Sequence, residues 1–443
     1  MKVVISAQDY GFCPTSYAFL IAREVKALFN NVTFSLIDTG SVRIFNQNNL
    51  DLGLTIESKS DWAAVDCLIS FYEPEQLFEA WLHKIPTLYY CNLLSLWLEN
   101  TRLPMNQISE YILGLYVLRE AKEYDAARDM LNSLKDKDVF AFQLAGYFLA
   151  DKVFCRPDWE ITKDIARLPK SVQEKTQVLG IPMILPAPKA DHIRKNEIVF
   201  QLSGGTSPEV SAQDKEAYIR GCYTLLLAMK QEYPQYRYLF CANATQLNAL
   251  NPALPSAEGV EIKPTMEQAE FQHHLADASA LFVPPGLGTT YEAIHMGIPL
   301  FYLPSHHPFQ MDNINRLEKN RLKMGKSNIG FDHPEQAGSF ERLQNCLRAY
   351  FANPHLFMAE VNAFMQNMVP NWAQTKSDNH QALVEAYQFP QPFISSKKFF
   401  QVIMNQLFAL LSPQQLSSIK FFRPARAATV STEQVEQTEI AQP

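Results

Sequence analysis

Short apolar runs alternate with amphipathic segments along the first part of the chain. Residues 3–6 and 32–38 are apolar and rich in β-branched side chains, whereas residues 15–29 between them carry apolar side chains at helical spacing. Residues 66–91 repeat this order of strand, helix and strand. Strands that alternate with helices predict β-α-β units and therefore a parallel sheet.

The pattern changes between residues 108 and 150, where apolar residues recur at helical spacing without a strand-like run. We expect this segment to form a helical insertion in the first α/β unit. A second alternating region begins at residue 197 and predicts another parallel sheet. Its strands are expected near residues 197–201, 236–242, 259–264, 280–283 and 299–304, with helices between them and over residues 339–388.

The two regions predict an α/β protein with two similar parallel-sheet domains that face each other. A proline-rich and then charged stretch near the middle of the chain is the best linker candidate. The expected organisation is a first domain over residues 1–185, a linker over 186–196, a second domain over 197–372, a helix over 373–390 that crosses back to the first domain, and an amphipathic helix with a disordered polar tail over 391–443.

The composition is that of an ordinary globular protein, with 47% hydrophobic and 19% charged residues and a net charge of −7. This acidic balance argues against a nucleic-acid partner. The seven cysteines are scattered without a C-x-x-C pair, which indicates reduced thiols rather than a disulfide frame or a zinc site. The apolar run at the N-terminus is too short for a signal peptide. We therefore expect a cytoplasmic protein, with membrane association left open.

An apolar stripe near the C-terminus is flanked by basic residues. Such a stripe is typical of a helix that lies in a membrane interface, but it also suits a helix that packs on a protein core. Packing on the first domain is the favoured interpretation. The stripe consists of Phe399, Phe400, Ile403, Leu407, Leu410 and Leu411.

The strongest candidate site follows residues 280–283, where the chain reads Pro-Pro-Gly-Leu-Gly-Thr-Thr-Tyr-Glu. The prolines end a paired strand, and the glycines permit left-handed backbone and leave room for a ligand. The free N–H groups of a helix opening at the threonines attract phosphate, and the glutamate can accept hydrogen bonds from a ribose. A plain turn with a capping glutamate explains the pattern equally well. The candidates are Gly286, Gly288, Thr289, Thr290 and Glu292.

Two further turns carry polar residues after predicted strands of the same sheet. The first is a glycine-rich turn whose N–H groups and hydroxyls suit phosphate oxygens. The second carries amide side chains that can bind sugar hydroxyls, and its two adjacent histidines are interpreted as surface residues. Open parallel sheets bind ligands at this edge. The candidates are Ser203, Gly204, Gly205 and Thr206 in the first turn, and Gln310 and Asn313 after the second.

In the first half of the chain, Asp9 follows the first predicted strand and would face a cleft between the domains. A carboxylate there can act as a general base. An aspartate that binds nearby backbone N–H groups in a loop is an equally good interpretation.

Taken together, these residues resemble the GT-B glycosyltransferases, in particular the group that contains the lipid II N-acetylglucosaminyl transferase and the UDP-glycosyltransferases. The resemblance covers roughly residues 1–388 and is strongest over 276–320. It implies that Gly288, Thr289 and Thr290 hold the diphosphate of a nucleotide-sugar donor, that Glu292 binds the ribose, that Gln310 and its neighbours bind the sugar, and that Met266 lies near the base. A UDP-linked donor, no further cofactor and no metal are expected.

One departure from the family pattern concerns the first strand-helix turn. Many relatives carry a glycine-rich turn with a histidine there, whereas this chain has Phe12 and Cys13. Asp9 is then the candidate base. The expected function is transfer of a sugar to a small-molecule or lipid-linked acceptor. The alternatives are a non-catalytic nucleotide-sugar binder or partner subunit, favoured by the missing histidine, and a nucleotide-sugar hydrolase or epimerase.

Overall fold

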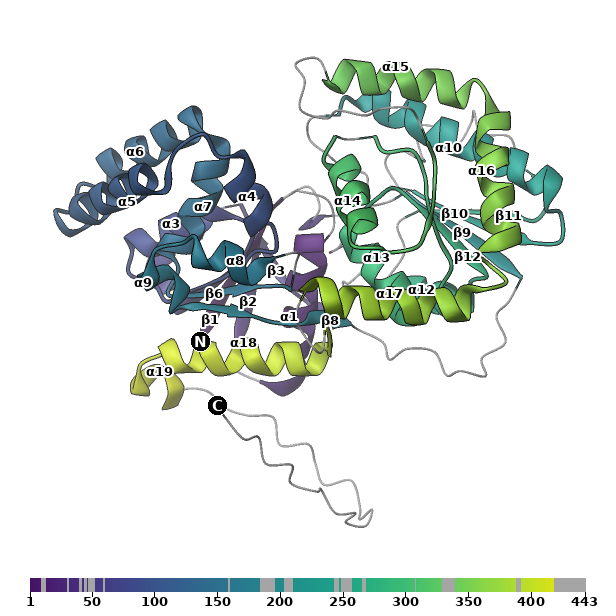
Figure 1. Ribbon diagram of the computed structural model, residues 1–443. Helices are drawn as coiled ribbons and strands as arrows, with labels where there is room; N and C mark the ends of the chain where they lie inside the picture. Colours follow the sequence, from purple (N-terminus) through teal and green to yellow (C-terminus); the bar gives the residue numbers. More distant parts are fainter. Residues whose placement is uncertain are drawn as a thin grey trace, which may run out of the picture.

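Two parallel sheets lie side by side, each with helices packed on it (Figure 1). The structure is a computed structural model, and none of the helices in its described part is long and apolar enough to cross a membrane. It describes residues 1–8, 13–29, 32–39, 42–43, 46, 52–58, 60–157, 160–183, 196–202, 210–242, 247, 257–264, 268–306, 308–328, 339–387 and 392–417.

The first sheet has seven strands in the order β3-β2-β1-β4-β5-β6-β7. All neighbours pair in parallel, with Ile5 beside Ile69 and Tyr90 beside Phe154. Because the order reverses at β1, connecting helices can cover both faces of the sheet. The strands are β1 (Lys2–Ala7), β2 (Thr33–Ile37), β3 (Thr55–Glu57), β4 (Cys67–Phe71), β5 (Thr87–Tyr90), β6 (Lys152–Cys155) and β7 (Thr176–Val178).

The helices around the first sheet include the expected insertion, which consists of three helices. The first of them, α5, packs on α6 and α7, and α7 in turn packs on α3. Asp138 begins α7 by accepting hydrogen bonds from the N–H groups of Phe140 and Ala141 at 2.9 and 3.0 Å. The elements are α1 (Cys13–Leu28), the 3₁₀ turn η2 (Trp62–Ala64), α3 (Pro74–Leu82), α4 (Leu94–Asn100), α5 (Met105–Glu120), α6 (Tyr124–Lys137), α7 (Val139–Leu149), α8 (Ile161–Ala166) and α9 (Lys170–Gln173).

The second sheet has six parallel strands in the order β11-β10-β9-β12-β13-β14. The rings of Phe200 and Phe282 stack at 4.7 Å between its central strands. The strands are β9 (Glu197–Gln201), β10 (Arg237–Cys241), β11 (Val260–Lys263), β12 (Ala280–Val283), β13 (Leu300–Tyr302) and β14 (Gly325–Lys326). The helices are α10 (Ala212–Glu232), α12 (Gln268–Asp277), α13 (Leu287–Met296), α14 (Pro308–Lys319), α15 (Ser339–Phe351), α16 (Pro354–Asn367) and α17 (Trp372–Tyr387).

The chain returns to the first domain after α17. This helix packs on the core of the second sheet, whereas α18 (Ser396–Leu410) packs on the core of the first. Between them, β15 (Phe393–Ser395) pairs in parallel with β8 (Ile181–Met183), and α19 (Pro413–Ser417) follows α18. Figure 1 shows α17 and α18 along the same side of the molecule, one under each domain. The apolar stripe of α18 therefore lies on protein, which agrees with the favoured interpretation.

The α/β fold with two facing parallel-sheet domains, a helical insertion and a C-terminal helical segment is confirmed. Six strands were not anticipated, because they are short and their apolar runs are too brief to stand out from their surroundings. They are β3, β6, β7, β8, β14 and β15. The exact domain limits stay a prediction. The linker at 186–196 lies almost wholly outside the described residues, as does the polar tail from 418 onward.

Replacing Phe399 by Ala should lower the free energy of unfolding by about 3–5 kcal/mol. The ring is fully buried, with centroids 6.0 Å from Tyr17 and 5.5 Å from Tyr90 of the first domain. Urea denaturation measures the change, and Gln401→Ala on the exposed face of α18 is the control. Wild-type stability of the Phe399→Ala protein would show that α18 does not depend on this packing.

Candidate functional site

Three neighbouring strands of the second sheet bring the candidate residues to one edge. Because β12 pairs in parallel with both β9 and β13, the carboxyl ends of all three strands lie together. The chain leaves β12 through Pro284 and Pro285 into α13, and leaves β13 through residues 303–306 toward α14. The turn after β9 falls outside the described residues, so the roles of Ser203, Gly204, Gly205 and Thr206 stay predictions.

Within the described residues, the N-terminus of α13 has no side-chain cap. Gly286 is the N-cap residue, and its carbonyl accepts the first helical bond from Thr290 N at 3.1 Å. The N–H groups of Leu287, Gly288 and Thr289 therefore have no partner within the helix. A Cβ added at Gly286 would meet only Pro284 O, at 3.8 Å, so a ligand can approach. This end combines free donors, a positive dipole and open space, which suits an anion.

The glycines at this turn act differently from the expectation. Gly286 has φ −109° and ψ 129°, which any residue adopts, and Gly288 lies inside α13. Left-handed backbone occurs instead at Gly297, with φ 70°, where it ends the helix. The value of Gly286 is therefore its missing side chain rather than its backbone freedom.

Thr290 has a structural role that the sequence did not reveal. Its side chain is fully buried, and its Oγ1 donates to Gly286 O at 2.7 Å. Since that hydroxyl has one proton, Tyr302 Oη must donate to Thr290 Oγ1, at 2.6 Å. These bonds fix the start of α13 against β13. Thr289 is only partly buried. Of the two threonines, it is therefore the one whose hydroxyl and N–H a ligand can reach.

Glu292 does not cap α13, so the interpretation of this residue as a capping glutamate is wrong. It lies in the second turn, because the helix begins at Leu287, and the first turn contains no acidic residue. Among the described residues, no hydrogen bond or ion pair to its carboxylate is recorded. Burial raises its pKa to about 7. A partly exposed carboxyl group with a raised pKa and, among the described residues, no hydrogen-bond partner is the most unusual feature of this edge.

The amide side chains of α14 hold the turns together. Gln310 Oε1 accepts from His306 N at 3.0 Å, and Asn313 Nδ2 donates to Pro285 O at 3.1 Å. Each amide group thus uses one atom to fix a turn. In the part of the chain that the structure describes, Gln310 Nε2 and Asn313 Oδ1 have no recorded bond, so they can still bind hydroxyl groups.

Two residues after β13 were missed or misjudged from the sequence. His306 was interpreted as a surface residue, but it is 3% exposed and its ring lies 4.6 Å from that of Tyr218. Ser305 is 1% exposed, and its Oγ has no hydrogen-bond partner among the described residues. Nothing in the local sequence marks a serine before two histidines as buried. Its free hydroxyl adds a polar group at the same strand end.

Asp9 and Met266 lie outside the described residues, so their roles stay predictions. Glu73, a second acidic residue at a strand end of the first domain, is described. Its carboxylate accepts from Glu75 N at 3.0 Å and Gln76 N at 2.7 Å and so caps α3. Burial raises its pKa to about 7 despite these bonds. Glu73 can therefore take up a proton near neutral pH, although it also holds a helix end.

No metal cluster is found among the residues that the structure describes: no three His, Cys, Asp or Glu side chains are suitably grouped. The sequence Asp136-Lys137-Asp138 has the spacing of a metal-binding D-x-D motif. However, Asp138 already accepts hydrogen bonds from Thr101 Oγ1 at 2.9 Å, from Arg102 N and from the first N–H groups of α7. Its oxygens are thus committed to the helical insertion.

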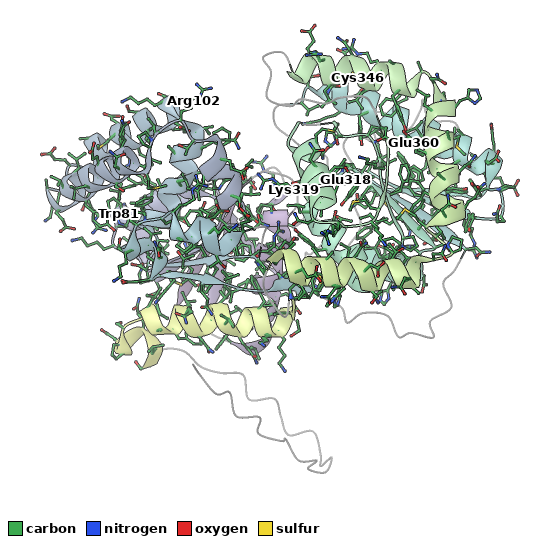
Figure 2. The ribbon with its side chains drawn as sticks, viewed as in Figure 1. Trp81, Arg102, Glu318, Lys319, Cys346 and Glu360 are labelled. Atoms are coloured by element: carbon green, nitrogen blue, oxygen red, sulfur yellow. The ribbon has the colours of Figure 1, made fainter. Side chains whose placement is uncertain are left out.

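The helix that carries Gln310 and Asn313 also contacts the first domain. Arg316 of α14 forms an ion pair with Glu99 of α4. Lys319, which Figure 2 places on the side of the second domain that faces the first, interacts electrostatically with Glu160. The candidate site therefore lies on the part of the second domain that is turned toward the first.

No protein-family model matches the sequence, and no curated protein matches it significantly. By structure, the chain is similar to the spinosyn rhamnosyltransferase SpnG, with 11% identity, a TM-score of 0.51 and coverage of 91% of this chain and 100% of that one. Os79 from O. sativa in complex with UDP matches with 13% identity, a TM-score of 0.48 and coverage of 91% and 99%. MurG from Acinetobacter baumannii matches with 13% identity, a TM-score of 0.40 and coverage of 91% and 99%. The first match confirms the GT-B fold.

Thr290→Val should lower the free energy of unfolding by about 1–3 kcal/mol, because the buried Tyr302 hydroxyl would lose its acceptor. Thr289→Val is the matched control, since its side chain is partly exposed. It should change stability by no more than about 0.5 kcal/mol. Urea denaturation compares the two variants, and equal losses would contradict the assigned division of roles.

Glu292→Gln should stabilise the free protein at alkaline pH but not at acidic pH. Burial raises the pKa of Glu292 from 4.5 to about 7, so the folded state favours the protonated form. The wild-type protein therefore loses stability as the pH rises from near 4.5 through 7, whereas a neutral glutamine does not. Thermal unfolding across this range measures the difference. Parallel curves for the two proteins would show that ionising Glu292 carries no penalty.

Proposed function

We propose that this chain is a GT-B glycosyltransferase that moves a sugar from a nucleotide-diphosphate donor to an acceptor hydroxyl without a metal ion. The observation that carries the proposal is Glu292, a partly exposed carboxyl group with a raised pKa and no partner among the described residues, on a helix whose N-terminus has no side-chain cap. The fold shared with a rhamnosyltransferase supports a sugar-transfer reaction.

The donor would bind along the start of α13. Its diphosphate would accept hydrogen bonds from the N–H groups of Gly288 and Thr289, where the helix dipole also favours negative charge. Ionised Glu292 would accept hydrogen bonds from two ribose hydroxyls, which would replace the water lost on burial. The remaining amide atoms of Gln310 and Asn313 would bind sugar hydroxyls.

Other parts of the donor site rest on the sequence resemblance. The turn over Ser203, Gly204, Gly205 and Thr206 would complete the phosphate site, and Met266 would lie near the base. The resemblance implies a uridine nucleotide. Acceptors that fit the same resemblance are small molecules and lipid-linked sugars, and the latter would bring the protein to the cytoplasmic face of a membrane.

Catalysis would consist of one displacement at the anomeric carbon. An acceptor oxygen forms a bond to that carbon while the bond to the diphosphate oxygen breaks, and a carboxylate takes the acceptor proton. The charge that develops on the departing diphosphate is stabilised by the fixed N–H groups of α13. Asp9 is the proposed base because it follows β1, and Glu73, which follows β4, is the alternative.

A non-catalytic nucleotide-sugar binder is the second candidate. It is favoured by Phe12 and Cys13, which stand where many GT-B enzymes carry a histidine. Such a protein would bind the donor in the same way and would not release free nucleotide. A hydrolase would release nucleotide with water alone, and an epimerase would change the sugar without releasing nucleotide.

Glu292→Ala should weaken binding of UDP, measured by isothermal titration calorimetry, because two hydrogen bonds to a charged group would be lost. Each such bond contributes about 1.5–3 kcal/mol, which corresponds to a loss of about tenfold or more in affinity. Glu292→Gln should be milder, since one acceptor oxygen remains. Glu318→Ala is the control, because Glu318 is exposed on the neighbouring α14. Unchanged affinity in a folded Glu292→Ala protein would remove the ribose role.

Release of UDP from UDP-sugars tests the reaction itself. A glycosyltransferase should release UDP only when a suitable acceptor is added, and Asp9→Asn should abolish release while leaving UDP affinity intact. Release without any acceptor would indicate a hydrolase. Binding without release across a broad acceptor panel, together with an unchanged sugar, would favour the non-catalytic binder.

A further inference from the structure

A fully buried arginine lies at the carboxyl edge of the first sheet. Arg156 directly follows β6 and is 0% exposed, which is rare for this residue type. The side chain of Asn92, which follows β5, contacts the guanidinium; when its amide group is assigned so that the oxygen faces Arg156, that oxygen accepts from Nη1 at 2.6 Å and from Nη2 at 3.0 Å. The Asn92 amide nitrogen then faces the hydroxyl of Tyr72, which follows β4. Three adjacent strand ends of the first domain thus hold the guanidinium in a fixed orientation.

The same guanidinium reaches across to the second domain. Its central carbon lies 4.8 Å from the centroid of the Tyr291 ring, and Tyr291 belongs to α13. Tyr291 is itself fully buried, and its hydroxyl is hydrogen-bonded to that of Tyr387 on α17. The aromatic face therefore cannot turn freely toward or away from the cation.

This contact is well suited to fix α13 in position. The attraction between a guanidinium and the face of an aromatic ring is strongest where water is excluded. Water is excluded here, because Arg156 and Tyr291 are both fully buried. Tyr291 stands between Thr290, which anchors the helix to β13, and Glu292, whose carboxylate has no recorded partner. A shift of Tyr291 would therefore move Glu292 and the first-turn N–H groups together. The ion pair between Arg316 and Glu99 is at the surface and partly exposed, so it constrains the domains less.

We propose that Arg156 is a positioning residue of the first domain that sets the placement of the donor-binding helix α13 through the face of Tyr291. Donor affinity in the second domain then depends on a residue that does not touch the donor. The link to donor affinity rests on the proposed function, whereas the placement of α13 can be measured without any ligand.

The chain offers a matched control for the chemistry. Arg119 also lies over aromatic rings, 4.2 Å from the centroid of Trp81 and 5.0 Å from that of Tyr116. All three of these residues belong to the first domain and its helical insertion. Arg119→Met therefore removes a similar contact without affecting the boundary between the domains.

Two readouts test the proposal on the full chain. Hydrogen–deuterium exchange without ligand reports on the amides of residues 290–297, and titration calorimetry with UDP reports on the donor site. Arg156→Met and Tyr291→Leu should each speed exchange in this segment and weaken UDP binding about tenfold, as expected for the loss of one desolvated cation–π contact. The double variant should be no weaker than the worse single variant. Tyr291→Phe, which keeps the ring, should retain UDP affinity. The UDP affinity of Arg156→Lys should lie between those of the wild-type protein and Arg156→Met.

Clear outcomes would overturn the proposal. One is wild-type exchange over residues 290–297 in Arg156→Met; another is an equal effect of Arg119→Met on that segment or on UDP affinity. If Arg156→Met does not fold, the comparison of Tyr291→Leu with Tyr291→Phe decides, and equal behaviour of these two would reject the role of the ring. If the wild-type protein binds no UDP, the proposed function fails, while the exchange results still decide whether Arg156 positions α13.

Discussion

The parallel pairing of β12 with β9 and β13 is the constraint on which the site depends. Parallel strands must end at the same edge, and each must turn there into a helix that returns along the sheet. Stacking of Phe282 on Phe200 and the buried apolar strands keep this pairing in register. The uncapped start of α13, the turn that holds Ser305 and the start of α14 are thereby brought together. No single one of these features would make a site alone.

Within α13, neighbouring residues serve different purposes because each step along a helix turns the side chain by about 100°. Thr290 faces β13 and Tyr291 faces Arg156 and Tyr387, and both are fully buried. Gly286 leaves space at the helix start, and Glu292 carries a pKa raised to about 7 by burial. The buried bonds of Thr290 and Tyr291 therefore fix the position of the partly exposed Glu292 on the same helix.

The sequence predicted the fold better than it predicted the roles of individual residues. Strands such as β4, whose five residues are all buried, stand out in the sequence, whereas β8 and β15 have three residues each and pair only with each other. Thr290 could not be assigned from its neighbours, since its partner Tyr302 comes from the next strand. Glu292 was weighed as a cap because the helix was expected to begin at the threonines, but it begins at Leu287.

The contacts and chain connections between the two domains differ in how strongly they constrain the domains relative to each other. A surface ion pair such as that of Arg316 and Glu99 contributes little, because solvent screens it and both side chains lose freedom. The return of the chain through β15 and α18 links the domains covalently, with β15 paired in parallel with β8. The Arg156 guanidinium, which lies 4.8 Å from the centroid of the Tyr291 ring and contacts Asn92, is by contrast buried together with both of these residues. Since a buried cation–π contact is stronger than a solvent-exposed ion pair, we expect the Arg156–Tyr291 contact to constrain the boundary between the domains more than the Arg316–Glu99 pair does.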